Sequence, residues 1–409
     1  MRPLLSAIQT ASLARALIGW GLLIWAAAGL RPAAAQTAGP RVLEQPAPAY
    51  TFGGPVTFEI TAAAAAEIAD LTLFVRTPDE PRTFVGKARF TRGLEAAAEY
   101  TLEPERRRLL PFSPVTYWWE ITDGAGRLLA TDPQTFVYTD NRFDWQTRAA
   151  GPLIVAWYAG GTAFGQAVLD AARDGLERAN RDLQAPLPET VWVYVYANAG
   201  DAAEALRPAD RAWADAHAAP VFGTVAVILD PADVNTPARL TREIPHELTH
   251  ILVARRAGAQ FANVPAWLNE GLAKFHEAEP DPDAAPQLAA AAEAGRLPAL
   301  AALCAPFPAD AAQAQLAYLE SESVVRYLRE RHGAASLNQL LDAYADGLDC
   351  EAGVQRVLGL SLADLQQQWQ AAKLQANPAS LPLRLLGPWL VLGLMVLAGP
   401  GLVWALTRR

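Results

Sequence analysis

Residues 246–250 read His-Glu-Leu-Thr-His, and residues 267–273 read Trp-Leu-Asn-Glu-Gly-Leu-Ala. Positions i and i+4 of a helix lie on the same face, so His246 and His250 can direct their imidazoles at one metal ion. Glu270 can supply a third ligand from a second helix and leave the fourth position open. Three protein ligands with an open position are typical of a catalytic zinc site, whereas structural zinc sites are closed.

Glu247 follows His246 on the same helix and is expected beside the metal rather than on it. From there it can take a proton from a water molecule whose pKa the zinc lowers toward neutrality. The alternative is a surface helix that carries two histidines by chance. The chain has only five histidines, and the second motif makes a chance match rarer still.

The two motifs together resemble the gluzincin metallopeptidases, and among them the bacterial peptidase MA-like domain related to the aminopeptidase N catalytic domain. The resemblance extends loosely over residues 150–375 and is specific around the zinc site. It implies Zn²⁺ ligands at His246, His250 and Glu270, with Glu247 as the general base. Nineteen residues separate His250 from Glu270, one more than is usual in aminopeptidase N relatives. No Gly-x-Met-Glu-Asn stretch for anchoring a substrate amine is found, so strict aminopeptidase activity is not expected.

The resemblance also implies an electrophile that stabilises the oxyanion of the tetrahedral intermediate. Tyr318 lies in residues 317–328, a helix-like stretch similar to the one that carries this tyrosine in aminopeptidase-like members. Its hydroxyl can donate to a developing alkoxide. An aromatic residue on an amphipathic helix can equally belong to the core, and this alternative stays open for Tyr318. Tyr327 falls on a stretch that indicates a buried position.

Other polar residues near the motifs give weaker signals. His276 can support a ligand from behind, although a partly exposed helix position is the simpler expectation. His217 and His332 have no ligand spacing and are expected on the surface. Glu243, one turn before His246, either orients a ligand or is a solvated glutamate that the helix dipole favours.

The two ends of the chain predict where this site works. Residues 1–35 combine arginines at positions 2 and 15 with an apolar run and a small-residue site after Ala35, the pattern of a cleaved signal peptide. An uncleaved anchor is the alternative. Residues 385–406 contain no charged residue, and a helix of that length rises about 33 Å, enough to span a hydrocarbon core of ~30 Å. A buried core helix is the alternative there.

Arg408 and Arg409 follow the second apolar segment and favour a cytoplasmic C-terminus. The expected protein is therefore a single-pass protein of the cell membrane, with its catalytic domain outside the cytoplasm. In that compartment the two cysteines, Cys304 and Cys350, can form a disulfide, with two free thiols as the alternative.

The formal net charge of −9 argues against a nucleic-acid partner. The only basic run, residues 106–108, is interpreted as a solvated turn.

Between the ends, the sequence pattern changes twice. Residues 40–143 hold short runs rich in Val, Thr, Tyr and Phe, which are typical of a β-sandwich of immunoglobulin or fibronectin type. Residues 140–145 then read as a linker. Residues 150–376 mix strands with helices and become wholly helical after Glu270. The predicted fold is thus multidomain: a sandwich, an α+β gluzincin domain with a helical C-terminal part, and a transmembrane helix.

The resemblance gives residues 224–229, the last strand before the motif helix, the role of a sheet edge that pairs with an extended substrate. The expected function is a membrane-anchored zinc metallopeptidase that hydrolyses peptide or protein substrates through a zinc-activated water. Two alternatives remain: a zinc-binding pseudopeptidase without turnover, and a cell-surface binding protein whose sandwich carries the function. An open cleft favours the peptidase, and an exposed apolar patch on the sandwich favours the binding protein.

Overall fold

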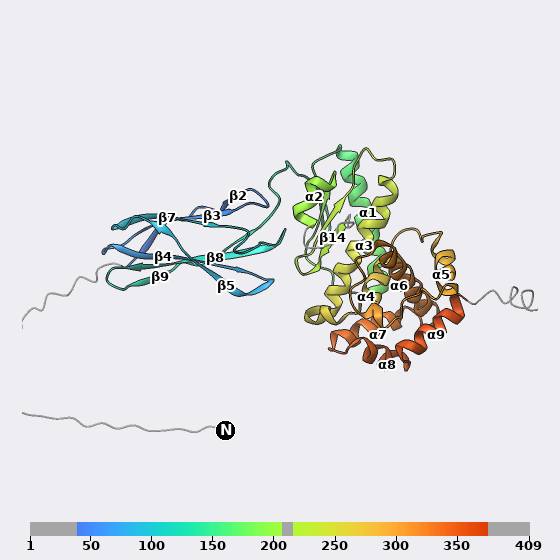
Figure 1. Ribbon diagram of the computed structural model, residues 1–409. Coiled ribbons are helices and arrows are strands. Elements are labelled where there is room, and N and C mark those ends of the chain that lie inside the picture. Colours follow the sequence, from blue (N-terminus) through green and yellow to red (C-terminus); the bar gives the residue numbers. More distant parts are fainter. Residues whose placement is uncertain (1–38, 207–215, 375–409) are drawn as a thin grey trace, which may run out of the picture.

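Three five-stranded sheets and a helical C-terminal part make up the chain in the computed structural model, which describes residues 39–206 and 216–374 (Figure 1). The β-rich N-terminal region and the helical C-terminal region predicted from the sequence are confirmed. The predicted signal peptide, residues 1–35, and the predicted transmembrane helix, residues 385–406, lie outside the described residues. Within the described ranges, no helix combines the length and the apolar character needed to cross a membrane.

The first two sheets are antiparallel and form the N-terminal region, at the left in Figure 1. One sheet has the order β1 (Arg41–Glu44), β3 (Val56–Ala63), β7 (Glu95–Leu102) and β6 (Arg89–Phe90), with β2 (Ala49–Tyr50) paired to β3. The other has the order β10 (Gln134–Val137), β8 (Pro114–Asp123), β4 (Ile68–Thr77) and β5 (Glu80–Lys87), with β9 (Leu128–Ala130) paired to β8. Alternate side chains of β8 are buried along its whole length, because successive residues of a strand point to opposite faces.

The third sheet has the order β11 (Gln146–Ala150), β12 (Leu153–Trp157), β13 (Val191–Tyr196), β15 (Thr224–Ile228) and β14 (Ala216–Ala219). The three central strands are parallel, and β11 and β14 are antiparallel to them. The expectation that residues 224–229 form the sheet edge is wrong, because β14 pairs outside β15. A short helix, η2 (Pro220–Phe222), and Gly223 at φ +62° turn the chain between these two strands.

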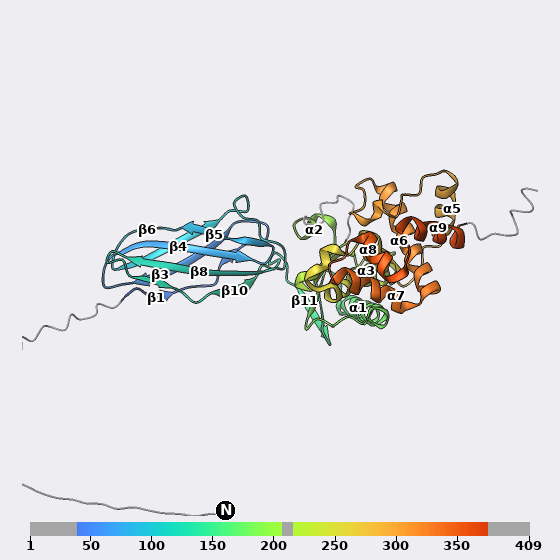
Figure 2. The ribbon, with the colours of Figure 1, turned by 90° about the horizontal axis from the view of Figure 1, so that it is seen from below.

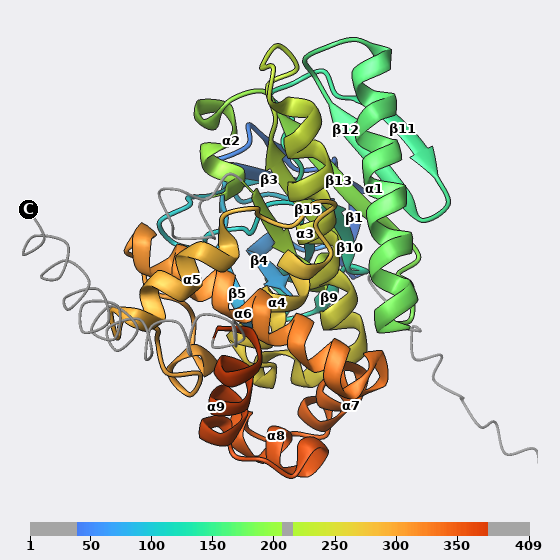
Figure 3. The same ribbon diagram turned by 90° about the vertical axis from the view of Figure 1, so that its right-hand side faces the viewer.

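Helices cover the two faces of this sheet unequally. Helices α1 (Thr162–Leu183) and α3 (Thr236–Ala257) pack together on one face (Figure 3). The short helix α2 (Ala199–Leu206) contacts β13 and β15 and shares a core with the sandwich. The Cγ atom of Pro245 in α3 would lie 2.7 Å from a Cβ atom built on Gly175 of α1. Glycine at 175 therefore lets the two helices approach closely.

The helical C-terminal part follows α3 through η3 (Gly258–Asn263). It contains α4 (Ala266–Phe275), α5 (Ala284–Glu293), η4 (Ala302–Cys304), α6 (Ala311–His332), α7 (Ala334–Ala345), α8 (Cys350–Leu358) and α9 (Leu362–Lys373). A disulfide joins Cys304 to Cys350, which confirms the pairing that the sequence left open. It ties η4 to the first residue of α8.

The sandwich lies beside the third sheet, and the chain that joins β10 to β11 runs between them (Figure 2). Aromatic side chains from the two parts are in contact there. The ring of Phe112, in the loop before β8, stacks on that of Tyr194 in β13 with centroids 4.0 Å apart. The hydroxyl of Tyr196 donates to buried Asp140 at 2.9 Å, and Arg142 pairs with the same carboxylate at 2.6 Å. The residues expected to form a simple linker are thus fixed against the sheet.

Candidate metal centre

Two helices bring the three predicted ligands together. His246 and His250 lie one turn apart on α3, and Glu270 lies on α4. One ligand atom from each of these residues lies within 4.8 Å of the other two. The Nε2 atoms of His246 and His250 are both 3.5 Å from Oε2 of Glu270. All three side chains are less than one-fifth exposed.

This geometry fits zinc. Zinc holds nitrogen and oxygen ligands at about 2.0–2.2 Å in a tetrahedron, which puts neighbouring donor atoms about 3.3–3.6 Å apart. Both nitrogen-to-oxygen distances at Glu270 fall in that interval. The donor set of two imidazoles and one carboxylate is also one that zinc prefers in catalytic sites.

Each histidine is oriented through its other ring nitrogen. Nδ1 of His246 lies 3.0 Å from Oε1 of Glu277, and Nδ1 of His250 lies 3.0 Å from Oδ1 of Asn269. With the Nδ1–H groups donating to these oxygens, the Nε2 lone pairs face Glu270. Such outer partners fix the tautomer and the ring orientation of ligand histidines.

The position of Glu277 follows from a proline inside the motif helix. Pro245 has no N–H, so the carbonyl of Thr241 lacks its usual helical donor. The N–H of Ala278 donates to that carbonyl at 3.0 Å. This bond holds the chain just after α4 against α3, next to His246. Lys274 Nζ, at 3.2 Å from Glu277, stabilises the carboxylate there.

Glu247 is buried beside the ligands and is only 8% exposed. Burial raises the pKa of its carboxyl group, while the charges of His250 and His246 act in the opposite direction. Burial by itself would lower the pKa of His246, but hydrogen bonds with Glu270 and Glu277 outweigh it and raise this pKa to about 10. A proton and a metal ion compete for the same ring nitrogen, so zinc binding at His246 is coupled to proton release.

Tyr318 lies on the site side of α6. Its ring centroid is 6.3 Å from that of His246, and the ring of Phe307 packs edge-on against it at 5.0 Å. The close packing of α6 on α4 depends on Gly271, because a Cβ atom there would lie 2.5 Å from the carbonyl oxygen of Ser321. The glycine of the second motif therefore lets Tyr318 approach the ligands.

The structure also places the other candidate residues that the sequence suggested. His276 was expected to be partly exposed, and this is wrong. It is 1% exposed because it packs behind the motif helix, where its Nδ1 lies 3.4 Å from Thr249 Oγ1. Glu243 forms an ion pair with Arg239 at 2.7 Å rather than orienting a ligand histidine. Tyr327 is buried and His332 is exposed, as predicted.

Sequence reasoning did not identify Asn269 or Glu277 as supports for the ligands. Asn269 lies next to Glu270 within the motif, and that adjacency was an available signal. Glu277 lies seven residues after Glu270, about two helical turns further along, but α4 ends at Phe275. Helical periodicity therefore could not place Glu277 beside His246.

Comparisons with known proteins give one family match. The model of the Peptidase MA superfamily matches residues 171–375, half of the chain. An M1 zinc metallopeptidase from Deinococcus radiodurans is similar at 15% identity over 78% of this chain and 90% of that chain, with a TM-score of 0.36. A mutant of an M1 zinc metallopeptidase from the same organism is similar at 14% identity over 78% of this chain and 90% of that chain, with a TM-score of 0.38.

A third solved structure, a Br derivative of BhCBM56, is 15% identical over 24% of this chain and 97% of that chain, with a TM-score of 0.18. No curated protein matches the chain. The TM-scores of these solved structures are too low to transfer a role to this chain.

Proposed function

This chain belongs to the Peptidase MA superfamily, and we propose that it is a membrane-anchored zinc metallopeptidase that hydrolyses peptide bonds outside the cytoplasm. The observation that carries the proposal is the convergence of His246, His250 and Glu270, with both nitrogen-to-oxygen distances at 3.5 Å. Buried Glu247 lies beside them and supplies a base that the ligand set itself lacks.

His246, His250 and Glu270 would hold the zinc, which when bound supplies a Lewis acid that polarises a carbonyl and lowers the pKa of water. Glu247 accepts a proton from the attacking water and passes it to the leaving amine. Burial raises the pKa of the Glu247 carboxyl group, which makes its carboxylate a stronger base toward the water. Tyr318 donates a hydrogen bond to the oxygen on which charge develops.

The substrate backbone is assigned to β14, not to β15. Among the described strands, β14 pairs only with β15, and it lies against the motif helix α3. An extended peptide can add to such an edge through main-chain hydrogen bonds. This arrangement supports a peptide or protein substrate.

The location rests on the two apolar ends of the sequence, residues 1–35 and 385–406. The disulfide between Cys304 and Cys350 supports it, because disulfides persist in oxidising compartments outside the cytoplasm.

The test compares substitutions of the proposed base with substitutions of the proposed metal ligands in the purified protein. The wild type is expected to carry about one zinc ion per chain, by metal analysis, and to hydrolyse peptides from a mixed library. Glu270→Ala and His250→Ala are expected to lose both metal and activity, whereas Glu247→Gln keeps the metal and loses activity. A Glu247→Gln protein that loses zinc as badly as His250→Ala would show that Glu247 is a ligand. Wild-type protein that holds zinc but cleaves no peptide would instead favour a pseudopeptidase.

A further inference from the structure

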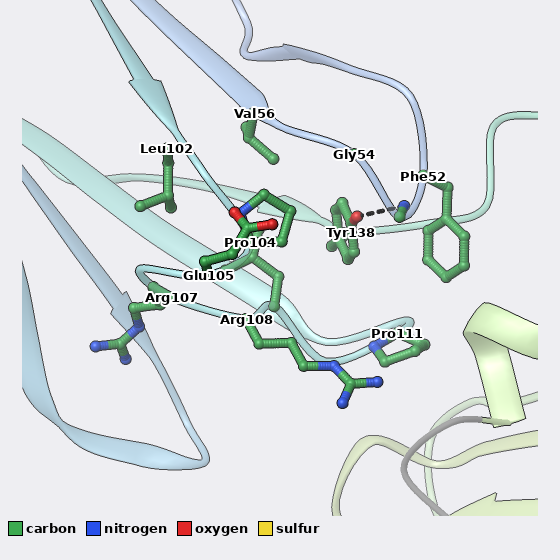
Figure 4. Close-up of a pocket in the computed structure, with 12 residues that line it drawn as sticks. Phe52, Gly54, Val56, Leu102, Pro104, Glu105, Arg107, Arg108, Pro111 and Tyr138 are labelled. Carbon is green, nitrogen blue, oxygen red and sulfur yellow. Dashed lines mark hydrogen bonds between the residues drawn. The ribbon is translucent and has the colours of Figure 1, made fainter.

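A pocket of about 200 Å³ lies at the end of the sandwich nearest the third sheet (Figure 4). Its floor is apolar and well packed. Five floor side chains are at least nine-tenths buried: Phe52, Val56, Leu102, Leu109 and Tyr138. The neighbouring Pro111 precedes Phe112, the residue that stacks on Tyr194. The pocket is thus built on ordered structure, on the opposite face of the third sheet from α1 and α3.

Three charged residues from one turn border this pocket (Figure 4). Arg107 is committed to the fold, since its guanidinium donates to Thr77 Oγ1 at 2.7 Å and to the carbonyl of Arg82 at 2.6 Å. Residues 106–108 were predicted to form a solvated turn. This is confirmed for Arg106 and Arg108, which are exposed, but Arg107 is partly buried. Glu105 and Arg108 are exposed, and in the described part of the chain neither makes a hydrogen bond or an ion pair.

The charges, the apolar floor and the volume of the pocket limit the classes of ligand that it can bind. An unpaired cation and an unpaired anion at the rim select a molecule that carries both signs, and they disfavour nucleic acids and other polyanions. The apolar floor selects an apolar side chain. Drug-sized ligands occupy about 300–1,000 Å³, so this smaller pocket suits one or two amino-acid residues.

We propose that the pocket binds an apolar amino acid or dipeptide in its zwitterionic form. The side chain lies on the floor, the carboxylate accepts hydrogen bonds from Arg108, and the amine donates to Glu105. Such zwitterions are what peptide hydrolysis releases, but the binding requires no turnover and goes beyond the proposed function.

Calorimetric titration of the full chain tests the ligand class. L-leucine or Leu-Leu is expected to bind saturably, and the tighter of the two gives the length of the ligand. N-acetyl-leucine and leucinamide each lack one charge, so each is expected to bind at least about tenfold more weakly than leucine, because a charge-assisted hydrogen bond is lost. Blocked ligands that bind as tightly as leucine would overturn the proposal.

Variants of the turn test the location. Arg108→Gln is expected to weaken binding at least about tenfold. Arg106→Gln is the matched control: Arg106 is an exposed arginine of the same turn that does not border the pocket. Circular dichroism confirms that both variants are folded.

An amino acid can also bind at the metal centre. Titration after zinc removal distinguishes binding there from binding in this pocket. Binding is expected to persist in the stripped protein. Binding that vanishes with zinc and is indifferent to Arg108→Gln, or no saturable binding at all, would overturn the pocket proposal. Neither result would bear on the hydrolysis itself, which the Glu247 and Glu270 variants test.

Discussion

Oε1 of Glu277 lies 3.0 Å from Nδ1 of His246, although the two residues are 31 positions apart in the chain. The carbonyl of Thr241, left free by Pro245, helps to hold this contact through the N–H of Ala278. A proline that weakens the motif helix therefore contributes to orienting the first ligand of that helix.

Removal of this carboxylate is expected to weaken the metal centre. Glu277→Ala should raise the zinc dissociation constant about 10–100-fold, the usual effect of losing an outer partner of a ligand histidine. Competition with a chromophoric chelator measures it. Glu279→Gln is the control, because Glu279 is an exposed acid two positions further on. Equal zinc affinity in the wild type and Glu277→Ala would show that the contact does not support the ligand.

The hydroxyl of Tyr318 is expected to act only in the transition state. Tyr318→Phe should lower kcat by about 10²–10³, with little change in KM or zinc content. Tyr327→Phe on the same helix is the control, since that hydroxyl lies 3.5 Å from Gln368 Oε1, away from the ligands. A loss confined to KM would assign Tyr318 to substrate binding instead.

Glu320 is expected to make stability depend on pH. It is fully buried, neither carboxyl oxygen has a hydrogen-bond partner among the described residues, and burial raises its pKa to about 8 from an ordinary value of 4.5. An acid whose pKa is raised by folding contributes stability below its unfolded pKa, and this contribution is lost as pH rises through the folded value. The free energy of unfolding should therefore fall between pH 5 and pH 8, by at most about 5 kcal/mol from this group.

Urea denaturation of the wild type and Glu320→Gln over this pH range checks the effect. The difference between the two proteins should change steadily up to pH 8 and then level off. Parallel pH profiles would mean that Glu320 does not titrate in this range.

The disulfide is expected to be a major source of stability. Cys304 and Cys350 are separated by 46 positions, and the chain-entropy relation for such a loop gives about 4 kcal/mol. Added reductant should lower the midpoint of denaturation of the wild type. A double variant, Cys304→Ser with Cys350→Ser, should start lower and no longer respond to reductant. An unchanged wild-type midpoint under full reduction would argue against this contribution.

The membrane anchor can be tested by truncation. The full chain is expected to fractionate as an integral membrane protein, whereas a chain that ends at Pro378 should be soluble and still bind zinc. Protease added outside intact cells should digest the zinc domain and leave residues 385–409 protected. Protection of the residues around His246 under those conditions would reverse the orientation.

The sequence predicted those parts of the site that depend on local periodicity. His246 and His250 are four positions apart on one helix, and the second motif supplied Glu270. Parts that depend on tertiary packing were not predicted. Glu277 reaches His246 from beyond the end of a helix, and β14 takes the edge position because the chain folds back outside β15. Neither outcome has a signal with a fixed spacing in the sequence.

The stacking of Phe112 on Tyr194 has a consequence for cutting the chain. Tyr194, Ala226 and Ile228 belong to the same buried cluster as the sandwich core. An isolated fragment from residue 146 onward would expose this apolar sheet face to water and tend to aggregate. The sandwich and the zinc-binding part should therefore melt in one cooperative transition, and a usable catalytic fragment would need polar replacements on that face.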